Sequence, residues 1–242
     1  YHRISTTDVN RIKHLFLPIV VLVAPVLLVV TQPDLGTSIL IAIGGVVVAW
    51  LAGVRVKFFT YATILFVSLM PIAISFLKPY QKARILTFLN PDRDPLGAGY
   101  QIIQSKIAIG SGGIFGKGFL NGSQSYLDYL PEKHTDFIFT LFSEEFGFLG
   151  SISILALYSL IIYRIVQIGN VTRSSFGKLY CYSFATAFFV YVAVNMGMVL
   201  GLLPIVGAPL PIMSYGGSSM MAMMIALGIA MSCKIYKDTP VN

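Results

Sequence analysis

Three ionisable residues, Glu132, His134 and Asp136, occupy alternate positions just before a long apolar stretch of the chain. An apolar stretch of that length is typical of a membrane helix, so these side chains are expected at a membrane boundary. Ionisable groups at such a boundary favour a functional site. A carboxylate there can accept a proton as a general base, and we predict that role for Asp136.

Other roles are open for these residues. Asp136 could be the N-cap of the helix that follows it. His134 could itself be the base, because an imidazole titrates near neutral pH, although orienting a substrate or a carboxylate is the preferred interpretation. Asp128 and Glu132 add negative charge near Asp136, and Lys133 opposes them.

Polar residues also lie inside apolar stretches. Glu144 and Glu145 must pair or face a cavity, because an isolated charge inside a membrane helix costs about 2 to 3 kcal/mol or more. A buried structural network is the preferred interpretation, since a rise of about 1.5 Å per residue would place Glu144 about 12 Å from Asp136. Asn195 is expected to link helices rather than to bind a ligand.

The segment 201–219, GLLPIVGAPLPIMSYGGSS, contains three prolines and four glycines, which break any helix. Broken backbone at membrane depth is tolerated only where it is buried in protein or lines a cavity. We expect either a helix-breaking connector or a substrate-lining segment on the outer side, with Ser214 and Tyr215 as its candidate contacts.

The composition indicates what holds these residues in place. Of 242 residues, 56% are hydrophobic and 11% are charged, whereas a soluble domain has about a quarter charged residues. A bilayer core of about 30 Å needs about 20 apolar residues per helix. Six stretches qualify, and they predict an all-α, polytopic membrane helix bundle that forms one domain over 1–242. The stretches are roughly 15–31, 35–53, 57–77, 146–168, 176–200 and 215–236.

The net charge of +7 does not indicate nucleic-acid binding, because the basic residues follow the membrane topology. Lys and Arg collect in the short segments of one side, and the short connections 31–35 and 201–214 of the other side hold none. By the positive-inside rule, both termini are cytoplasmic and the segment 78–134 is extracytoplasmic. The chain begins with Tyr1 rather than Met, so an N-terminal portion is expected to be missing.

The outer segment 78–134 is too long for a plain connection and is expected to form a catalytic loop. NPDRDP at 90–95 predicts a turn, and 100–109 predicts a short helix with Gln104 and Lys106 directed to its polar side. Gly110–Gly118 predicts a flexible bend. The bend lacks two of the four residues that a P-loop requires, although its backbone amides beside Lys117 could bind a lipid-linked phosphate.

Five motifs, in order along nearly the whole chain, resemble the SEDS family of shape, elongation, division and sporulation proteins, and their wording is closer to its RodA branch than to the division paralogue FtsW. They are QPDLGTS at 32–38, FLNPDRDPLGAGYQIIQSKIAIGSGG at 88–113, LPEKHTDFIF at 130–139, EEFG at 144–147 and the segment at 201–219. Family members have about ten membrane helices, so six here would leave the first four outside this chain.

The resemblance implies a peptidoglycan glycosyltransferase that polymerises lipid II at the outer face of the bacterial cytoplasmic membrane, during cell elongation and cell-shape maintenance. The essential aspartate of the family matches Asp136. Its second acidic position in the same loop is Asp128, where the division paralogue often carries Glu. A general base at Asp136 would take the proton of the acceptor sugar hydroxyl that attacks the donor chain.

The leaving undecaprenyl diphosphate needs cations beside it. Lys106, Lys117 and Arg84 are the candidates, and a divalent cation, Mg or Mn, could assist, although neither a ligand set nor a zinc-type cluster of Cys and His is visible. The substrate contacts expected in total are Asp128, Glu132, His134, Lys106, Lys117, Arg84, Gln104, Ser214 and Tyr215.

Two alternatives to the polymerase are a lipid II flippase and a scaffold of the elongation complex. A flippase predicts polar residues through the depth of the bundle, whereas the ionisable cluster here lies at the outer face. A scaffold should tolerate Asp136→Asn, which a polymerase should not. The resemblance also implies partners: a class B penicillin-binding transpeptidase and membrane proteins of the elongation complex.

Overall fold

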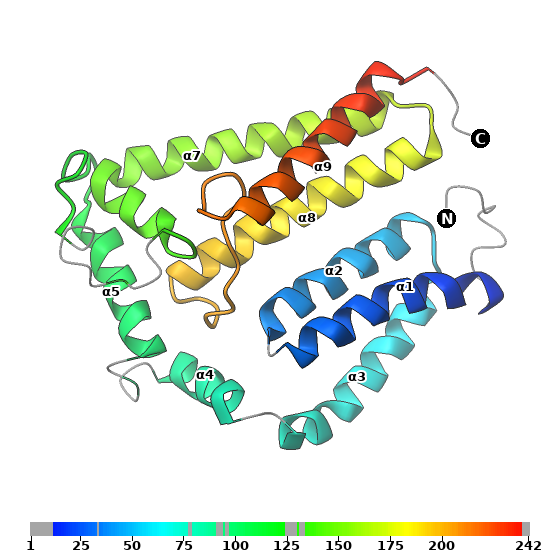
Figure 1. Ribbon diagram of the computed structural model, residues 1–242, viewed down its shortest axis with the longest axis horizontal. Coiled ribbons are helices and arrows are strands. Elements are labelled where there is room, and N and C mark those ends of the chain that lie inside the picture. Colours follow the sequence, from blue (N-terminus) through cyan, green and yellow to red (C-terminus); the bar gives the residue numbers. More distant parts are fainter. Residues whose placement is uncertain are drawn as a thin grey trace. The chain divides into compact units, whose positions relative to one another are not determined.

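The computed structural model describes residues 12–32, 34–76, 79–90, 94, 97–123, 130 and 134–238 (Figure 1). Every helix or strand assigned within these ranges is an α-helix, which confirms the all-α prediction. The helices are α1 (Ile12–Thr31), α2 (Leu35–Leu51), α3 (Val56–Phe76), α4 (Pro79–Leu89), α5 (Ala98–Ser111), α7 (Ile138–Val171), α8 (Ser175–Val199) and α9 (Gly217–Ile235).

The chain, predicted to form one domain, divides into two compact units. The first comprises Tyr1–Lys82, Ile165–Ala187 and Gly228–Asn242, and the second comprises Ala83–Arg164 and Phe188–Leu227. Helices α7, α8 and α9 each contribute residues to both units. Every described residue for which the sequence predicts a role at the site belongs to the second unit.

Within the part of the chain that the structure describes, α7, α8 and α9 are long and apolar enough to cross a membrane. Shorter apolar helices lie within α1, α2 and α3, so each of the six predicted stretches contains an apolar helix. In the first unit, α1 and α2 pack together as a hairpin (Figure 1). Asp34 caps α2 by accepting a hydrogen bond of 3.0 Å from the amide of Thr37.

Among the described residues of the predicted outer segment, α4 and α5 are helical. Helix α5 contains the short helix expected over 100–109 and extends it at both ends. Ile102 is buried at 2% exposed, but Ile107 is 48% exposed, whereas Gln104 is half-buried and Lys106 is exposed. Lys106 therefore lies on an exposed side of the helix, while the isoleucines are only partly buried. Most of the turn predicted at 90–95 lies outside the described residues.

Helix α7 begins earlier than the sequence predicts. The expected stretch starts at residue 146, but the helix starts at Ile138 and is broken at Gly147, which has φ 67° and ψ −161°. The polar pair Glu144 and Glu145 depresses the hydropathy of the first segment and conceals it from a search for apolar stretches. The membrane helix is thus preceded by a helical segment, 138–146, that carries both acidic residues.

The glycine-rich bend that follows α5 supplies hydrogen-bond partners to the backbone of α7 around this break. A broken helix leaves backbone amides and carbonyls without their usual partners, which is costly in a membrane. Four hydrogen bonds of 2.9 to 3.1 Å supply partners here: the amides of Lys117 and Gly118 donate to the carbonyls of Glu144 and Glu145, and the amides of Phe148 and Leu149 donate to the carbonyls of Gly113 and Ile114.

Glycine is required where the two segments meet. A Cβ atom on Gly116 would collide with the carbonyl of Glu145, and one on Gly147 would collide with the amide of Gly116. Both glycines also have positive φ, 82° and 67°, which side chains disfavour. The amides of Lys117 and Gly118 are already bonded to α7, so the phosphate nest considered from the sequence is not formed by them.

We predict that Gly116→Ala and Gly147→Ala each lower the thermal stability of the full-length protein in detergent. A side chain in this backbone region costs about 1 to 3 kcal/mol, and the collision adds to that cost. Gly110→Ala is the matched control: it lies in α5, a Cβ there meets nothing within 4 Å, and alanine favours a helix. Equal unfolding temperatures for all three variants would contradict the close packing of the bend against α7.

Candidate functional site

Asp136 lies in the turn His134–Phe137, directly before α7. Its side chain is half-buried, and Oδ2 lies 3.6 Å from the point where a Cβ atom on Gly207 would be. Gly207 has φ 73° and belongs to the non-helical segment that joins α8 to α9. The carboxylate therefore lies close to Gly207, which has no side chain of its own.

Three successive carbonyls of this turn each accept a hydrogen bond from elsewhere in the second unit. The donors come from α8 and from the connection between α8 and α9, which runs beside the first turns of α7 in Figure 1. A turn held at three consecutive carbonyls has little freedom to move its side chains. The bonds are Tyr215 N to His134 O (2.9 Å), Ser214 Oγ to Thr135 O (2.6 Å) and Asn195 Nδ2 to Asp136 O (2.9 Å).

Asn195 joins two loops to α8. Its side chain is fully buried, and Nδ2 donates both to the carbonyl of Asp136 and, at 2.7 Å, to that of Ala208. Its Oδ1 has no hydrogen-bond partner among the residues that the structure describes. The sequence suggested a link between helices, whereas the two partners of Asn195 lie outside helices, so it connects Asp136 to the segment that contains Gly207.

The connection between α8 and α9 is non-helical from Leu200 to Gly216, as its prolines and glycines predict. Ser214 is buried, and its hydroxyl also accepts a 2.7 Å hydrogen bond from the amide of Leu210. This hydroxyl supports the backbone on both sides, and the substrate contact expected of Ser214 stays a prediction.

The same connection contains a strained residue. Ile212 has φ 69°, a conformation that is unfavourable for a β-branched side chain. The neighbouring carbonyl of Pro211 accepts a 2.7 Å hydrogen bond from the buried hydroxyl of Tyr158 on α7. Strain of this kind persists only where surrounding contacts enforce it. The connection around Ile212 is therefore held by a hydrogen bond from α7 as well as by its own hydrogen bonds.

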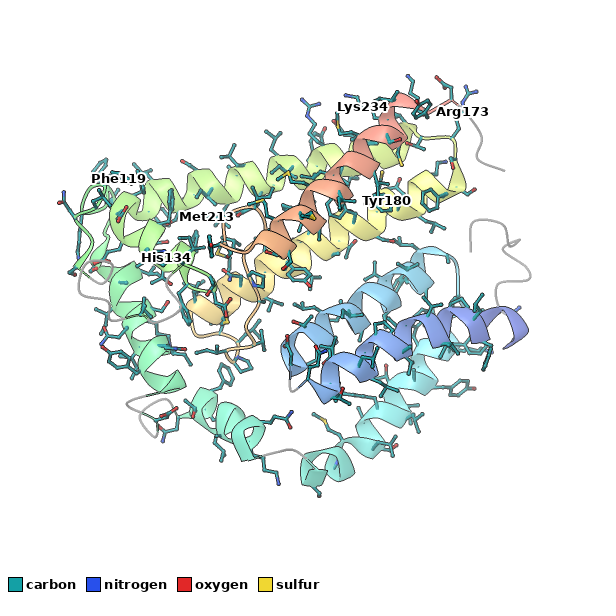
Figure 2. The ribbon with its side chains drawn as sticks, in the orientation of Figure 1. Phe119, His134, Arg173, Tyr180, Met213 and Lys234 are labelled. Carbon is teal, nitrogen blue, oxygen red and sulfur yellow. The ribbon has the colours of Figure 1, made fainter. Side chains whose placement is uncertain are left out.

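A cavity of about 610 Å³ opens where this connection meets the turn. That volume lies within the range of small-molecule sites. His134 and Met213 face the same region in Figure 2. Tyr215 is 81% exposed. The cavity is lined by His134, Ile138, Met213, Ser214, Tyr215, Gly216, Gly217 and Met220.

The side chain of Lys106, a residue of α5, lies beside the C-terminal end of α8. A Cβ atom on Gly201 would lie 2.8 Å from its Nζ, so the ammonium group is close to the backbone that follows the last turn of α8. The negative end of a helix dipole favours a cation in this position. The preceding residue, Ser105, fixes α5 to the same helix end by donating to the carbonyl of Val199 at 2.7 Å.

Lys117 has a different partner. Its Nζ lies 2.6 Å from Oε1 of Glu144, whose side chain is fully buried, and 2.9 Å from the hydroxyl of Ser123. Ser123 also donates to Glu144 at 3.0 Å. Glu145 is 9% exposed. The two acids are thus buried as expected, and the charge of Glu144 is compensated by Lys117.

Several candidate residues are not described at atomic detail. Asp128 and Glu132 lie outside the described residues, and Arg84 belongs to α4 but its side chain is likewise outside them. Within the described part of the chain, no group of three or more His, Cys, Asp or Glu side chains could hold a metal ion. The divalent cation considered from the sequence stays a prediction.

We predict that Asn195→Asp loosens the turn before α7. The aspartate has nearly the same shape but replaces the donor by an oxygen, which leaves two carbonyls unpaired at about 1 to 3 kcal/mol each. In the full-length protein, hydrogen exchange measured by mass spectrometry should rise in peptides that cover 134–141 and 205–216.

Thr172→Val is the control, because it removes a buried hydroxyl in the other unit. It should leave exchange in those two peptides unchanged. Equal exchange in Asn195→Asp and wild type would show that the turn does not depend on this side chain.

The family model described as "Cell cycle protein", for FtsW, RodA and SpoVE, matches residues 2–239. The chain is 48% identical over 227 residues to the peptidoglycan glycosyltransferase MrdB of Escherichia coli (strain K12), covering 93% of this chain and 61% of that protein. It is 49% identical over 156 residues to the peptidoglycan glycosyltransferase RodA of Treponema pallidum (strain Nichols), covering 64% of this chain and 36% of that protein. The chain thus spans about three fifths or less of the length of these relatives.

Solved structures have the same fold. A chain of a peptidoglycan synthase complex, solved to show how polymerization and crosslinking are coordinated, is 34% identical with a TM-score of 0.73 and covers 95% of this chain and 64% of its own. The rod shape determining protein RodA of Thermus thermophilus is 25% identical with a TM-score of 0.62, covering 97% of this chain and 62% of its own. The chain belongs to the SEDS family of membrane proteins, on its RodA-like branch.

Proposed function

We propose that the protein to which this chain belongs is a peptidoglycan glycosyltransferase, which polymerises lipid II at the outer face of the cytoplasmic membrane during cell elongation. The observation that carries the proposal is the setting of Asp136. Its carboxylate lies against Gly207, on a turn whose three carbonyls are hydrogen-bonded, beside a cavity at the start of a membrane helix. The peptidoglycan glycosyltransferases among its relatives support the same reaction class.

In the proposed reaction Asp136 accepts the proton of the 4-hydroxyl of the acceptor sugar. The hydroxyl oxygen forms a bond to the anomeric carbon of the donor chain while the bond from that carbon to the diphosphate breaks. Undecaprenyl diphosphate leaves with the electron pair, and Asp136 later returns the proton to water. General-base assistance of this kind contributes about 10² to 10⁴ in rate.

Fixing the turn that carries Asp136 assists the same step. A base acts efficiently only when its oxygen is already within hydrogen-bonding reach of the reacting hydroxyl. The bonds from Asn195, Ser214 and Tyr215 hold the backbone at and immediately before Asp136. These three residues therefore position the base, and Asn195 does so without being exposed to the substrate.

The charge that develops on the leaving diphosphate must be matched by a cation. We assign that role to Lys106, which is exposed at the end of α8, in the same unit as Asp136. Arg84 on α4 is a second candidate. Lys117 already compensates the buried charge of Glu144, so its positive charge is committed to the fold.

The cavity beside the turn suits a substrate with both sugar and lipid parts. His134 and Tyr215 offer groups that hydrogen-bond to sugar hydroxyls. Ile138, Met213 and Met220 provide an apolar wall that an isoprenoid chain could contact. We infer that the cavity receives the part of lipid II where the head group joins its lipid.

We also infer the topology and the partners. The chain would span the bacterial cytoplasmic membrane several times with both termini cytoplasmic, because its basic residues collect in the short segments of that side. A class B penicillin-binding transpeptidase would crosslink the new glycan, together with membrane proteins of the elongation complex. The similarity to a chain of a peptidoglycan synthase complex supports a crosslinking partner.

We predict that Asp136→Asn abolishes glycan synthesis, with a loss of at least about 10²-fold, because the amide cannot accept the proton. The measurement is lipid II polymerisation in liposomes by the full-length protein with its transpeptidase partner. Asp34→Asn is the matched control: it makes the same change at the N-cap of α2, where asparagine caps equally well. Equal yields from wild type and Asp136→Asn would remove Asp136 from the chemistry.

We predict that Lys106→Gln lowers kcat/KM for lipid II by about tenfold to a hundredfold, whereas Lys106→Arg retains most of it, because the positive charge stabilises the leaving diphosphate. Lys82→Gln removes an exposed lysine from α4 and serves as the control. A loss of the same size in Lys106→Arg and Lys106→Gln would indicate that the shape of the lysine, rather than its charge, is what the reaction needs.

A further inference from the structure

The bend that follows α5 exposes large apolar side chains. Ile114 is 61% exposed, Phe115 80%, Phe119 69% and Leu120 70%. Four such residues within seven positions form an apolar patch, the 114–120 patch, that would be unfavourable in water. Patches of this kind mark contacts with a protein or a membrane.

We propose that the 114–120 patch inserts into the outer leaflet of the bilayer and anchors this end of α7 at a fixed depth. The proposal rests on the membrane-spanning character of α7 and is independent of the reaction assigned to Asp136. Its partner is the hydrocarbon of the lipid acyl chains.

Part of the backbone of the bend meets the main condition for entering hydrocarbon. A segment there must satisfy its amides and carbonyls internally, because no water is available to pair with them. The amides at 117 and 118 and the carbonyls at 113 and 114 bond to α7, and the amide of Gly116 bonds to the carbonyl of Gly112 at 2.8 Å. An ordinary exposed loop would leave several of these groups to water.

The charge of the bend is also compatible with lipid. Lys117 is the only charged residue between Lys106 and Asp128. Its ammonium group forms an ion pair with Glu144 and a hydrogen bond with Ser123. The pair is neutral as a whole, which reduces the cost of placing this lysine at the edge of the membrane.

The 114–120 patch lies next to exposed apolar side chains of α7, a helix that is long and apolar enough to cross a membrane. Phe119 contacts Phe146 on α7, with 6.3 Å between ring centroids, and Phe146 stacks on Phe142 at 4.6 Å. Beyond them, Phe148 and Leu149 are exposed on the same helix, 60% and 50%. This continuity with a membrane-spanning helix favours lipid over a protein as the partner.

An anchored bend would have a consequence for the site. Figure 2 shows Phe119 and His134 at the same end of α7. The bend is joined to this end by the four hydrogen bonds around Gly147. Insertion of the 114–120 patch would therefore hold the turn of Asp136 near the lipid head groups, where a lipid-linked substrate presents its sugars.

The test is spin-label accessibility in liposomes of phosphatidylethanolamine and phosphatidylglycerol. Single cysteines, Phe115→Cys and Phe119→Cys, are introduced into the full-length protein after its other cysteines have been replaced. Leu157→Cys on α7 is the lipid-exposed reference, and Lys237→Cys after α9 is the water-exposed reference. Collision rates with oxygen and with a polar nickel chelate are measured at each position.

The ratio of oxygen to chelate collisions at 115 and 119 should match that at 157 and exceed that at 237 by about tenfold, because a polar chelate partitions poorly into hydrocarbon. A ratio like that at 237 would place the patch in water and overturn the proposal. Exclusion of both reagents would show that protein covers the patch, which would overturn it equally. Thermal unfolding close to that of the parent protein confirms that each labelled variant is folded.

Discussion

The second unit depends on the hydrogen bonds that join the bend after α5 to α7 on both sides of Gly147. A helix broken at membrane depth leaves backbone groups that lipid cannot satisfy, at a cost of several kcal/mol for each group. The bend after α5 supplies those partners from residues about thirty positions earlier in the chain. Its glycines allow the two backbones to approach closely enough to bond. Without this repair, the segment 138–146 would lose the four hydrogen bonds that join the bend to both sides of the break in α7.

The turn that carries Asp136 is then held by contacts with its backbone. Tyr215 bonds through its own amide, and only Ser214 and Asn195 use side chains. Backbone carbonyls are present whatever the local sequence, so these three bonds hold the turn without using its own side chains. The hydroxyl of Tyr158 holds the same connection at Pro211, next to the strained residue Ile212. Rigidity around the site thus comes from broken segments that are cross-linked by hydrogen bonds.

Local patterns predicted much of this fold. Apolar stretches indicate membrane helices, the prolines and glycines of 201–216 indicate an irregular connection, and Asp34 has the position of a cap. The break at Gly147 was missed, because its cost is removed by a bend far away in sequence. The sequence did not predict that Ser214 bonds to the turn of Asp136, and it predicted that Asn195 links helices rather than loops. Both contacts join residues that lie far apart in the chain. The sequence does contain a signal of this contact. Gly112 and Gly116 lie near a lone lysine and Gly147 lies near two acids, all in apolar surroundings, which suggests that the lysine pairs with an acid.

Two lysines that look alike in the sequence acquire different roles from their surroundings. Lys106 and Lys117 both lie among uncharged residues of the outer segment, and both are candidates for the diphosphate. Lys117 meets a carboxylate that is entirely buried, and removing one member of such a pair leaves an uncompensated charge that costs about 3 to 5 kcal/mol. Lys106 is exposed at a helix end, where the dipole attracts it only weakly. Loss of Lys117 should therefore destabilise the fold, whereas loss of Lys106 should act mainly on the reaction. The strength of each existing partner, rather than the residue type, decides which charge remains available to a substrate.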